Sequence, residues 1–171
     1  MTAIISLLIP ALIAVESGGN PAAIGDNGRA VGCLQIRAEC LSDVNRIAGT
    51  QYTPTDRLSP EKSTEMCRLY LTHYGNAYRR RTGEEPNAEI LARIWNGGPS
   101  GYAKTATARY WEKTRAHLKK AETKREETVS KSGTAESISR APPPSDTPTE
   151  TRTAAGCYPR RTHARAPVRN M

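Results

Sequence analysis

The apolar residues of this 171-residue chain thin out after about residue 118, and this break most limits what the chain can fold into. Up to Leu118 they recur at regular spacings. From Lys119 onward, Val129, Ile138 and Val168 are almost the only aliphatic side chains larger than Ala. A packed core needs such side chains, so only the first part can build one. We therefore predict a folded domain over residues 1–120 and a disordered, charged tail rich in Pro, Ser and Thr over residues 121–171.

The net charge of +8 is not caused by the tail alone. Residues 1–120 hold 16 Lys and Arg against 11 Asp and Glu, so the folded part is basic as well. A basic surface favours acidic polymers such as nucleic acid, anionic lipid or bacterial wall polymers. We do not expect nucleic acid as the partner, because the aromatic residues lie mainly on predicted core faces rather than between exposed basic residues.

The cysteines give no sign of a metal site. Cys33, Cys40 and Cys67 fall in the folded part and Cys157 in the tail, and no pair has the close spacing of a zinc site. We expect no metal and no cofactor, and we favour buried free thiols. A disulfide within the domain, for example between Cys40 and Cys67, stays open if the protein is exported.

An apolar stretch at residues 4–15 has the length of a signal peptide, but no Lys or Arg precedes it. It is also too short to span a bilayer, and it runs directly into Glu16. We therefore interpret it as the buried first helix, and the export route stays open. Because Pro suits the first turn of a helix, Pro10 predicts a regular helix over residues 10–17, which Gly18 ends.

The rest of the domain is predicted to be mainly helical with a minimal β element. Glycine-rich turns lead to a short extended piece at residues 31–36, and a charged loop is expected at residues 79–86. Capping residues and apolar spacings predict helices over residues 38–48, from Pro60 to about Tyr78, from Asn87 to Asn96, and from about Tyr102 to Lys120.

Glu16 is the first candidate for chemistry. It follows an apolar helix and stands at the helix C-terminus, and both a poorly hydrated setting and the negative end of the helix dipole disfavour a carboxylate. The pKa of Glu16 should therefore be raised. A carboxylic acid that keeps its proton near neutral pH is what cleavage of a glycosidic bond requires.

Three segments occur in an order that points to a family. The chain carries Glu16-Ser17 at a helix end, then Gly32-x-x-Gln35, and much later Trp95-Asn96-Gly97. Each segment is weak alone, but the ordered set resembles the lytic transglycosylase and goose-type lysozyme superfamily over about residues 4–115. The resemblance implies a small lysozyme-like domain and peptidoglycan glycan strands as the substrate.

The resemblance also implies roles for individual residues. Glu16 would act as catalytic acid and base, Ser17 would shape the site beside it, Gln35 would contact an N-acetyl sugar, and Asn96 would line the opposite wall. Tyr102 and Tyr110 are candidates for a sugar-stacking surface. Many family members have Tyr where this chain has Trp95, so Trp95 either replaces the contact of that phenol with the catalytic Glu or is simply packed.

The product of the cut stays open between two reactions. A lytic transglycosylase needs no second carboxylate, whereas a goose-type hydrolase would use Asp26, which is equally common as a turn residue. Arg37 stands where goose-type enzymes carry an acidic residue, which favours the transglycosylase. A non-catalytic wall-binding module is a further alternative. We expect action in the cell envelope or periplasm or on a phage, possibly within a secretion, conjugation or phage assembly.

Overall fold

Helices dominate the part of the chain that the structure describes. This computed structural model describes residues 1–132, with side chains as far as Lys124. The helices are α1 (Thr2–Ser17), α2 (Ala38–Ala48), α3 (Pro60–Thr82), α4 (Ala88–Gly97) and α5 (Ala108–Ser132), joined by 3₁₀ turns η1 (Asp26–Gly28), η2 (Pro54–Leu58), η3 (Gly101–Ala103) and η4 (Thr105–Thr107). Two short strands, β1 (Ile24–Gly25) and β2 (Ala30–Val31), pair antiparallel. The prediction of a mainly helical fold with a minimal β element is confirmed.

Helix α1 is longer than Pro10 suggested. It begins at Thr2 and keeps Pro10 in its interior, so the expected start at residue 10 is wrong. An interior Pro removes one helical hydrogen bond. Ile5, Leu8 and Leu12 are fully buried along this helix, and burying each such side chain stabilises a fold by about 1.5–3 kcal/mol. This packing outweighs the cost of Pro10 and keeps the first turns helical.

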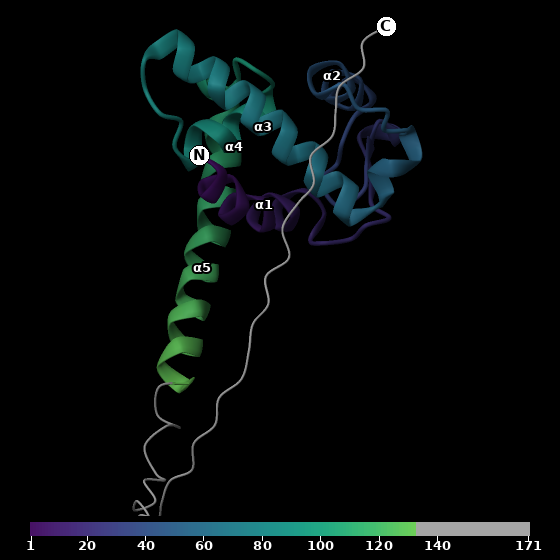
Figure 1. Cartoon of the computed structure of the whole chain (residues 1–171). Helices are drawn as coiled ribbons and strands as arrows, with labels where there is room; N and C mark the ends of the chain where they lie inside the picture. Colours follow the sequence, from purple (N-terminus) through teal and green to yellow (C-terminus); the bar gives the residue numbers. More distant parts are fainter. Residues whose placement is uncertain (133–171) are drawn as a thin grey trace, which may run out of the picture. The chain divides into compact units, whose positions relative to one another are not determined.

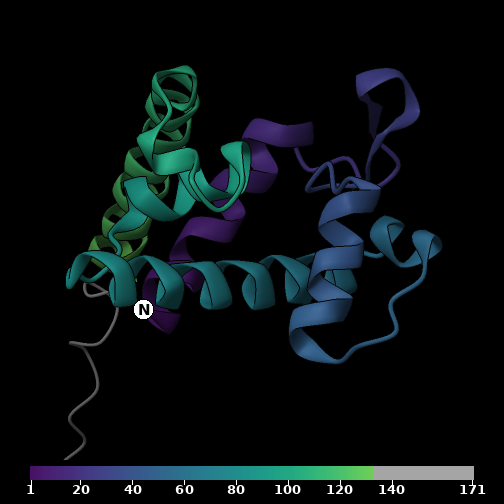
Figure 2. The ribbon, with the colours of Figure 1, turned by 90° about the horizontal axis from the view of Figure 1, so that it is seen from above.

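Helix α3 runs past two groups of elements, which Figures 1 and 2 show at its two ends. Near its beginning lie the hairpin, α2 and η2, which together form the hairpin side (residues 24–58). Near its end lie α4, η3, η4 and the start of α5, which form the C-terminal side (residues 84–118). Helix α1 contacts α3, α4 and α5, and the hydroxyl of Ser17 at its end donates to the carbonyl of Cys33 on the hairpin side. The end of α1, which carries Glu16, therefore lies between the two sides.

One apolar core joins these elements. Side chains from α1, the segment after β2, α2, α3 and α4 all contribute to it, and the largest fully buried ones include Ile5, Leu8, Leu12, Leu34, Ile36, Met66, Leu71, Leu91 and Ile94. Gly75 of α3 lets two neighbours come close, because a Cβ there would lie 2.7 Å from the sulfur of Met1 and 3.1 Å from Leu91. The core therefore holds the start of α1 and helix α4 against the same face of α3.

Two further predicted boundaries differ from the structure. The charged loop expected at residues 79–86 is wrong for Arg79–Arg81, which continue α3 to Thr82, where basic side chains suit the C-terminal end of the helix dipole. The last helix begins at Ala108 rather than near Tyr102. The hydroxyl of Thr107 donates to the carbonyls of Gly101 and Lys104, which stabilises tight turns there instead of an α-helix.

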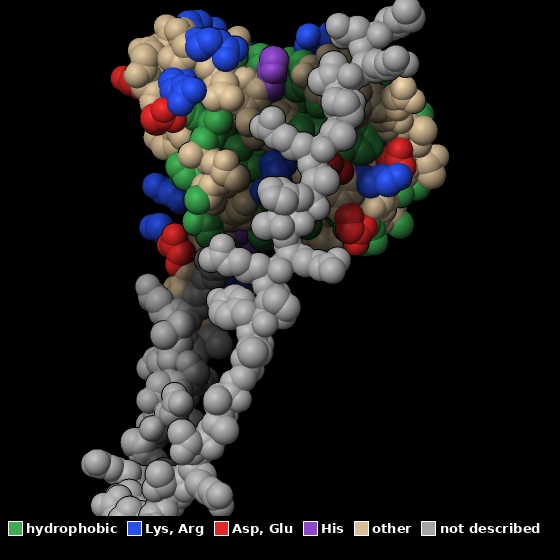
Figure 3. Space-filling model, viewed as in Figure 1, with side chains coloured by type: hydrophobic (Ala, Val, Ile, Leu, Met, Phe, Trp, Pro, Cys, Tyr) green, Lys and Arg blue, Asp and Glu red, His purple; other side chains and the backbone are tan. Residues whose placement is uncertain are grey.

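Charged side chains are spread over the surface. On the face drawn in Figure 3, Lys and Arg side chains are interspersed with acidic ones. No helix among the described residues is long and apolar enough to span a membrane. The disordered tail predicted for residues 121–171 falls largely outside the described residues, and the division at residue 120 stays a prediction.

Candidate active site

Glu16 lies in a half-buried position near the end of α1, where the left-handed Gly18 (φ +64°) ends the helix. Its Oε1 accepts a hydrogen bond of 2.7 Å from the hydroxyl of Tyr110 in α5. The side chain of Trp95, at the end of α4, is a second hydrogen-bond partner. The apolar residues of α1 pack into the core and so place the Glu16 carboxyl next to two aromatic donors from the C-terminal side.

Burial is the largest influence on Glu16 and raises its pKa. The hydrogen bonds from Tyr110 and Trp95 and the positive charge of Arg37 act in the opposite direction without cancelling it. Burial likewise raises the pKa of Tyr110, and the adjacent Glu16 adds to this shift, so the phenol keeps its proton and remains a donor. The direction predicted for Glu16 from the sequence is the one the structure shows.

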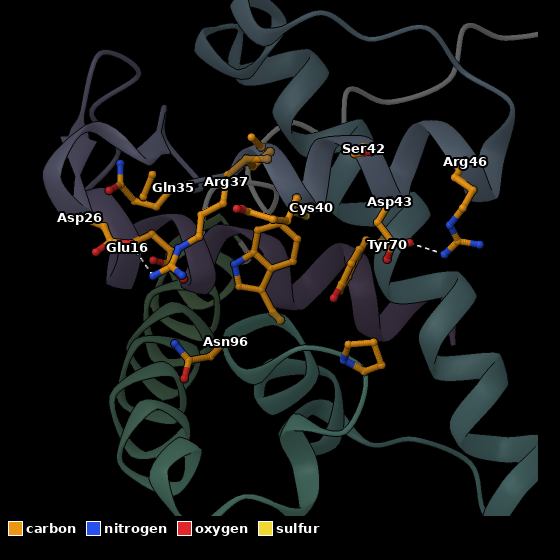
Figure 4. A pocket seen from close by; sticks show the side chains of 16 residues that line it. Glu16, Asp26, Gln35, Arg37, Cys40, Ser42, Asp43, Arg46, Tyr70 and Asn96 are labelled. Carbon is orange, nitrogen blue, oxygen red and sulfur yellow. Dashed lines mark hydrogen bonds and ion pairs between the residues drawn. The ribbon is translucent and has the colours of Figure 1, made fainter.

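A cleft of about 1060 Å³ opens beside Glu16. One wall comes from the hairpin side and the other from the end of α4 and the turn that follows. Figure 4 shows Glu16, Asp26, Gln35 and Arg37 gathered at one end, with Asn96 on the opposite wall. The full lining is Glu16, Asp26, Ala30, Gln35, Ile36, Arg37, Ala38, Glu39, Cys40, Ser42, Asp43, Arg46, Tyr70, Trp95, Asn96 and Pro99.

Asp26 has a different setting from Glu16. It begins the exposed turn of the hairpin with a left-handed backbone (φ +51°). One carboxylate oxygen pairs with Arg29 at 2.8 Å and the other with Arg37 at 2.6 Å. The structure therefore brings Asp26 into the cleft, but both of its oxygens are engaged by guanidinium groups.

Gln35 faces the cleft with a left-handed backbone (φ +49°). Its amide nitrogen donates to the carbonyls of Ala23 (3.2 Å) and Gly32 (3.0 Å). Its side-chain oxygen packs on Gly25, where any added Cβ would lie 2.2 Å from it. Both amide N–H groups thus serve the hairpin, and the oxygen is the atom left to accept from a ligand.

Ser17 connects α1 to the hairpin side. Its hydroxyl donates to the carbonyl of Cys33 at 2.8 Å and accepts from the N–H of Gly19 at 3.1 Å. It does not line the cleft itself. Its contacts fix the chain beside Glu16, which fits the shaping role that the resemblance implied.

The three aromatic candidates, Trp95, Tyr102 and Tyr110, differ in their relation to the cleft. Trp95 lines the cleft, hydrogen-bonds Glu16, and packs edge-on against Tyr70 with ring centroids 5.7 Å apart. Tyr110 supports Glu16 and is absent from the cleft lining. Tyr102 does not reach the cleft. Its ring packs against Tyr78 (4.9 Å) and lies under the guanidinium of Arg81.

The residues at the end of the cleft far from Glu16 were not predicted from the sequence. Asp43, Arg46 and Tyr70 lie there, with Cys40 and Ser42 between them and Glu16 (Figure 4). Cys33, Cys40 and Cys67 are free thiols, and burial raises the pKa of Cys40 to about 12, so this thiol is a poor nucleophile. Among the described side chains, no group of His, Cys, Asp or Glu is arranged to hold a metal ion.

This geometry agrees with the family comparison. A model of the transglycosylase SLT domain matches residues 2–118, which include every candidate residue named above. The chain belongs to the transglycosylase SLT domain family. The superfamily resemblance noted from the sequence is thereby confirmed.

Curated relatives of this SLT domain match over a shorter stretch. Proteins named endo-type membrane-bound lytic murein transglycosylase A from Klebsiella pneumoniae, Citrobacter koseri and Salmonella paratyphi B are each 40% identical to it over 68 residues. The matched stretch is 38% of this chain and 33% of each relative, so the chain spans about a third of the length of these proteins.

Proposed function

We propose that the chain cleaves the β-1,4 bond between N-acetylmuramic acid and N-acetylglucosamine in peptidoglycan, as a lytic transglycosylase. The observation that supports this best is Glu16 itself. It is a carboxyl group with a raised pKa, held by Tyr110 and Trp95 at one end of a cleft of about 1060 Å³. Such a group can carry the proton that the leaving sugar oxygen needs.

In the proposed reaction Glu16 acts twice. It first gives its proton to the glycosidic oxygen while the bond from that oxygen to the muramic C1 breaks. The carboxylate then takes the proton of the muramic 6-hydroxyl as this oxygen bonds to C1. The product ends in a 1,6-anhydro ring, no water is consumed, and Glu16 regains its proton. Tyr110 and Trp95 hold the carboxyl in place through both steps.

The setting of Asp26 favours this reaction over hydrolysis. A hydrolase needs a second carboxylate, either as a nucleophile or to activate water. Each oxygen of Asp26 is paired with a guanidinium group, one of Arg29 and one of Arg37, so the side chain is tied to the hairpin and to the segment before α2. We propose that Asp26 fixes the hairpin and Arg37, and that Gln35 and Asn96 contact the sugar chain from opposite walls.

The relatives named above are murein transglycosylases by name, and murein lies in the cell envelope. We therefore propose the envelope as the place of action. Association with a secretion, conjugation or phage assembly stays a prediction.

Mass spectrometry of the soluble products released from purified peptidoglycan tests the proposal. Products that end in 1,6-anhydromuramic acid would support a lytic transglycosylase. Reducing ends would make the protein a hydrolase and give Asp26 a role with water. Binding to peptidoglycan without any release would make it a wall-binding module.

A further inference from the structure

Helix α5 carries a line of basic side chains along one of its faces. With about 100° of rotation per helical residue, these side chains fall within an arc of about 80° around the helix axis. They are Arg109, Lys113, His117, Lys120 and Lys124, and all five are exposed. This line, called the basic stripe below, extends over about 22 Å at 1.5 Å per helical residue.

The apolar side chains of this part of α5 lie on a different face of the helix. Tyr110, Trp111 and Leu118 pack against the core of the domain, and Thr114 is fully buried. This packing fixes the rotation of α5 about its axis and keeps the basic stripe outside the contact with the core. Figure 1 shows that α5 also extends beyond the other helices. The stripe is therefore open to a partner along its length.

The charge of the basic stripe is not neutralised by neighbouring carboxylates. Among the described side chains, no Asp or Glu forms an ion pair with Arg109, Lys113 or Lys120. The two acidic residues in this stretch of α5, Glu112 and Glu122, lie outside the arc of the stripe. The basic side chains that do pair with a carboxylate lie in other elements, and they are Arg29, Arg37, Arg46, Lys62, Arg79 and Arg93. The stripe is thus a surface of one sign.

The shape and chemistry of the basic stripe fit a flat anionic surface. Because the stripe runs along one helix, a plane can bring all of its charges within the screening length of about 10 Å at once. Its cations are mostly Lys, whose compact charge suits dispersed phosphate groups rather than bidentate recognition. It has no aromatic side chain on which a base of single-stranded nucleic acid could stack. Clusters of Lys and Arg on a helix are typical of binding to anionic lipid.

We propose that the basic stripe of α5 binds the surface of a membrane that carries anionic phospholipids, without insertion into it. The apolar side chains of this part of α5 pack against the core, so the binding is electrostatic and should weaken steeply as the salt concentration rises. No residue of the stripe lines the cleft, so the inference does not depend on the proposed function.

Sedimentation of the full chain with lipid vesicles tests this proposal. The wild-type protein should bind vesicles of equimolar phosphatidylglycerol and phosphatidylcholine, but not vesicles of phosphatidylcholine alone. The double variant Arg109→Gln, Lys113→Gln should bind the anionic vesicles about thirtyfold more weakly.

The double variant Arg115→Gln, Lys119→Gln is the matched control. It removes one Arg and one Lys, at the same spacing and from exposed positions of the same helix, but outside the arc of the stripe. It should weaken binding by no more than about threefold, because these charges lie farther from a membrane that contacts the stripe.

A second measurement locates the contact on the helix. An amine-reactive reagent followed by mass spectrometry compares the labelling of individual lysines with and without anionic vesicles. Lys113 and Lys120 should be protected, whereas Lys119, on another face, should react as before. Because the labelling is measured at each lysine, basic residues elsewhere in the chain do not obscure the result.

Four outcomes would overturn the proposal. The first two are absence of binding to anionic vesicles and equally tight binding to neutral ones. The third is an equal loss of binding in the two double variants together with equal protection of the three lysines, since net charge alone would then explain the attraction. The fourth is tighter binding to a DNA duplex than to the vesicles at the same salt concentration, with the same dependence on Arg109 and Lys113, which would assign the stripe to nucleic acid.

Discussion

Glu16 and Asp26 are two carboxyl groups in one cleft with opposite surroundings. Glu16 stands on a buried helix and accepts hydrogen bonds from two uncharged donors, Tyr110 and Trp95. Asp26 stands on an exposed turn and is paired with two arginines. Arg37 lies between them, pairing with one and acting on the other through its charge.

This contrast shows how a fold can give two similar side chains different tasks. Uncharged donors orient a carboxyl group while leaving burial free to raise its pKa, so Glu16 can hold a proton. Guanidinium groups pair with both oxygens of Asp26 and tie it to the hairpin. The first arrangement suits acid catalysis, and the second suits a structural role at the edge of the cleft.

The largest effect on activity is expected when Glu16 can no longer donate a proton. Glu16→Gln keeps the size of the side chain but cannot donate a proton as an acid does, so release of soluble products should fall about a thousandfold. Unchanged circular dichroism would show that the fold is intact. Glu85→Gln is the matched control, because it makes the same substitution at an exposed ion pair with Arg79. Gln35→Glu does not serve as a control, because Gln35 lines the same cleft as Glu16. Full activity of Glu16→Gln would contradict the assignment.

The same variant should change stability in a pH-dependent way. Because the pKa of Glu16 is raised in the folded state, its contribution to stability is complete below the ordinary value of 4.5 and is lost as pH rises through the folded value. Gln has no such loss. Thermal unfolding should therefore show a higher Tm for Glu16→Gln than for wild type at neutral pH. This difference should shrink as the pH falls through the folded pKa towards 4.5, and should be absent below 4.5.

Much of this arrangement follows from local sequence. The helix predicted over residues 38–48 matches α2, and Asn87 begins α4 by accepting from the N–H of Ile90. Glu16 and Asn96 stand at helix ends marked by glycines. That they share one site was an expectation from the family resemblance.

Other parts depend on contacts that no local pattern contains. Tyr110 and Glu16 are 94 residues apart, and only the packing of α5 on α1 brings them together. Tyr102 looked equally suitable, but the turns η3 and η4 direct it towards Tyr78. From the sequence alone, Arg46 has no feature that distinguishes it from a solvated surface charge. Only the fold shows that this face of α2 is a wall of the cleft.

A smaller effect is expected when one uncharged donor is removed from Glu16. Tyr110→Phe deletes the 2.7 Å hydrogen bond, so the carboxyl loses orientation and activity should fall about tenfold. That bond lowers the pKa of Glu16, so its loss should raise the pKa further and move the alkaline limb of the pH–rate profile to higher pH. Tyr102→Phe is the control, because it removes the same hydroxyl from a residue outside the cleft and keeps the ring contact with Tyr78. It should change neither the activity nor the pH–rate profile. A limb that moves to lower pH would refute the role of Tyr110.

The smallest effect on activity is expected for substitution of Asp26. Asp26→Asn breaks the pairs with Arg29 and Arg37, which have exposed side chains, and such pairs contribute about 1 kcal/mol or less. Product release should therefore fall by no more than about fivefold, and the products should keep their 1,6-anhydro ends. A loss as large as that of Glu16→Gln, measured on the same peptidoglycan, would mean that Asp26 takes part in the chemistry. The two carboxyl groups would then act as a pair, and the arginines around Asp26 would have to release it during each turnover.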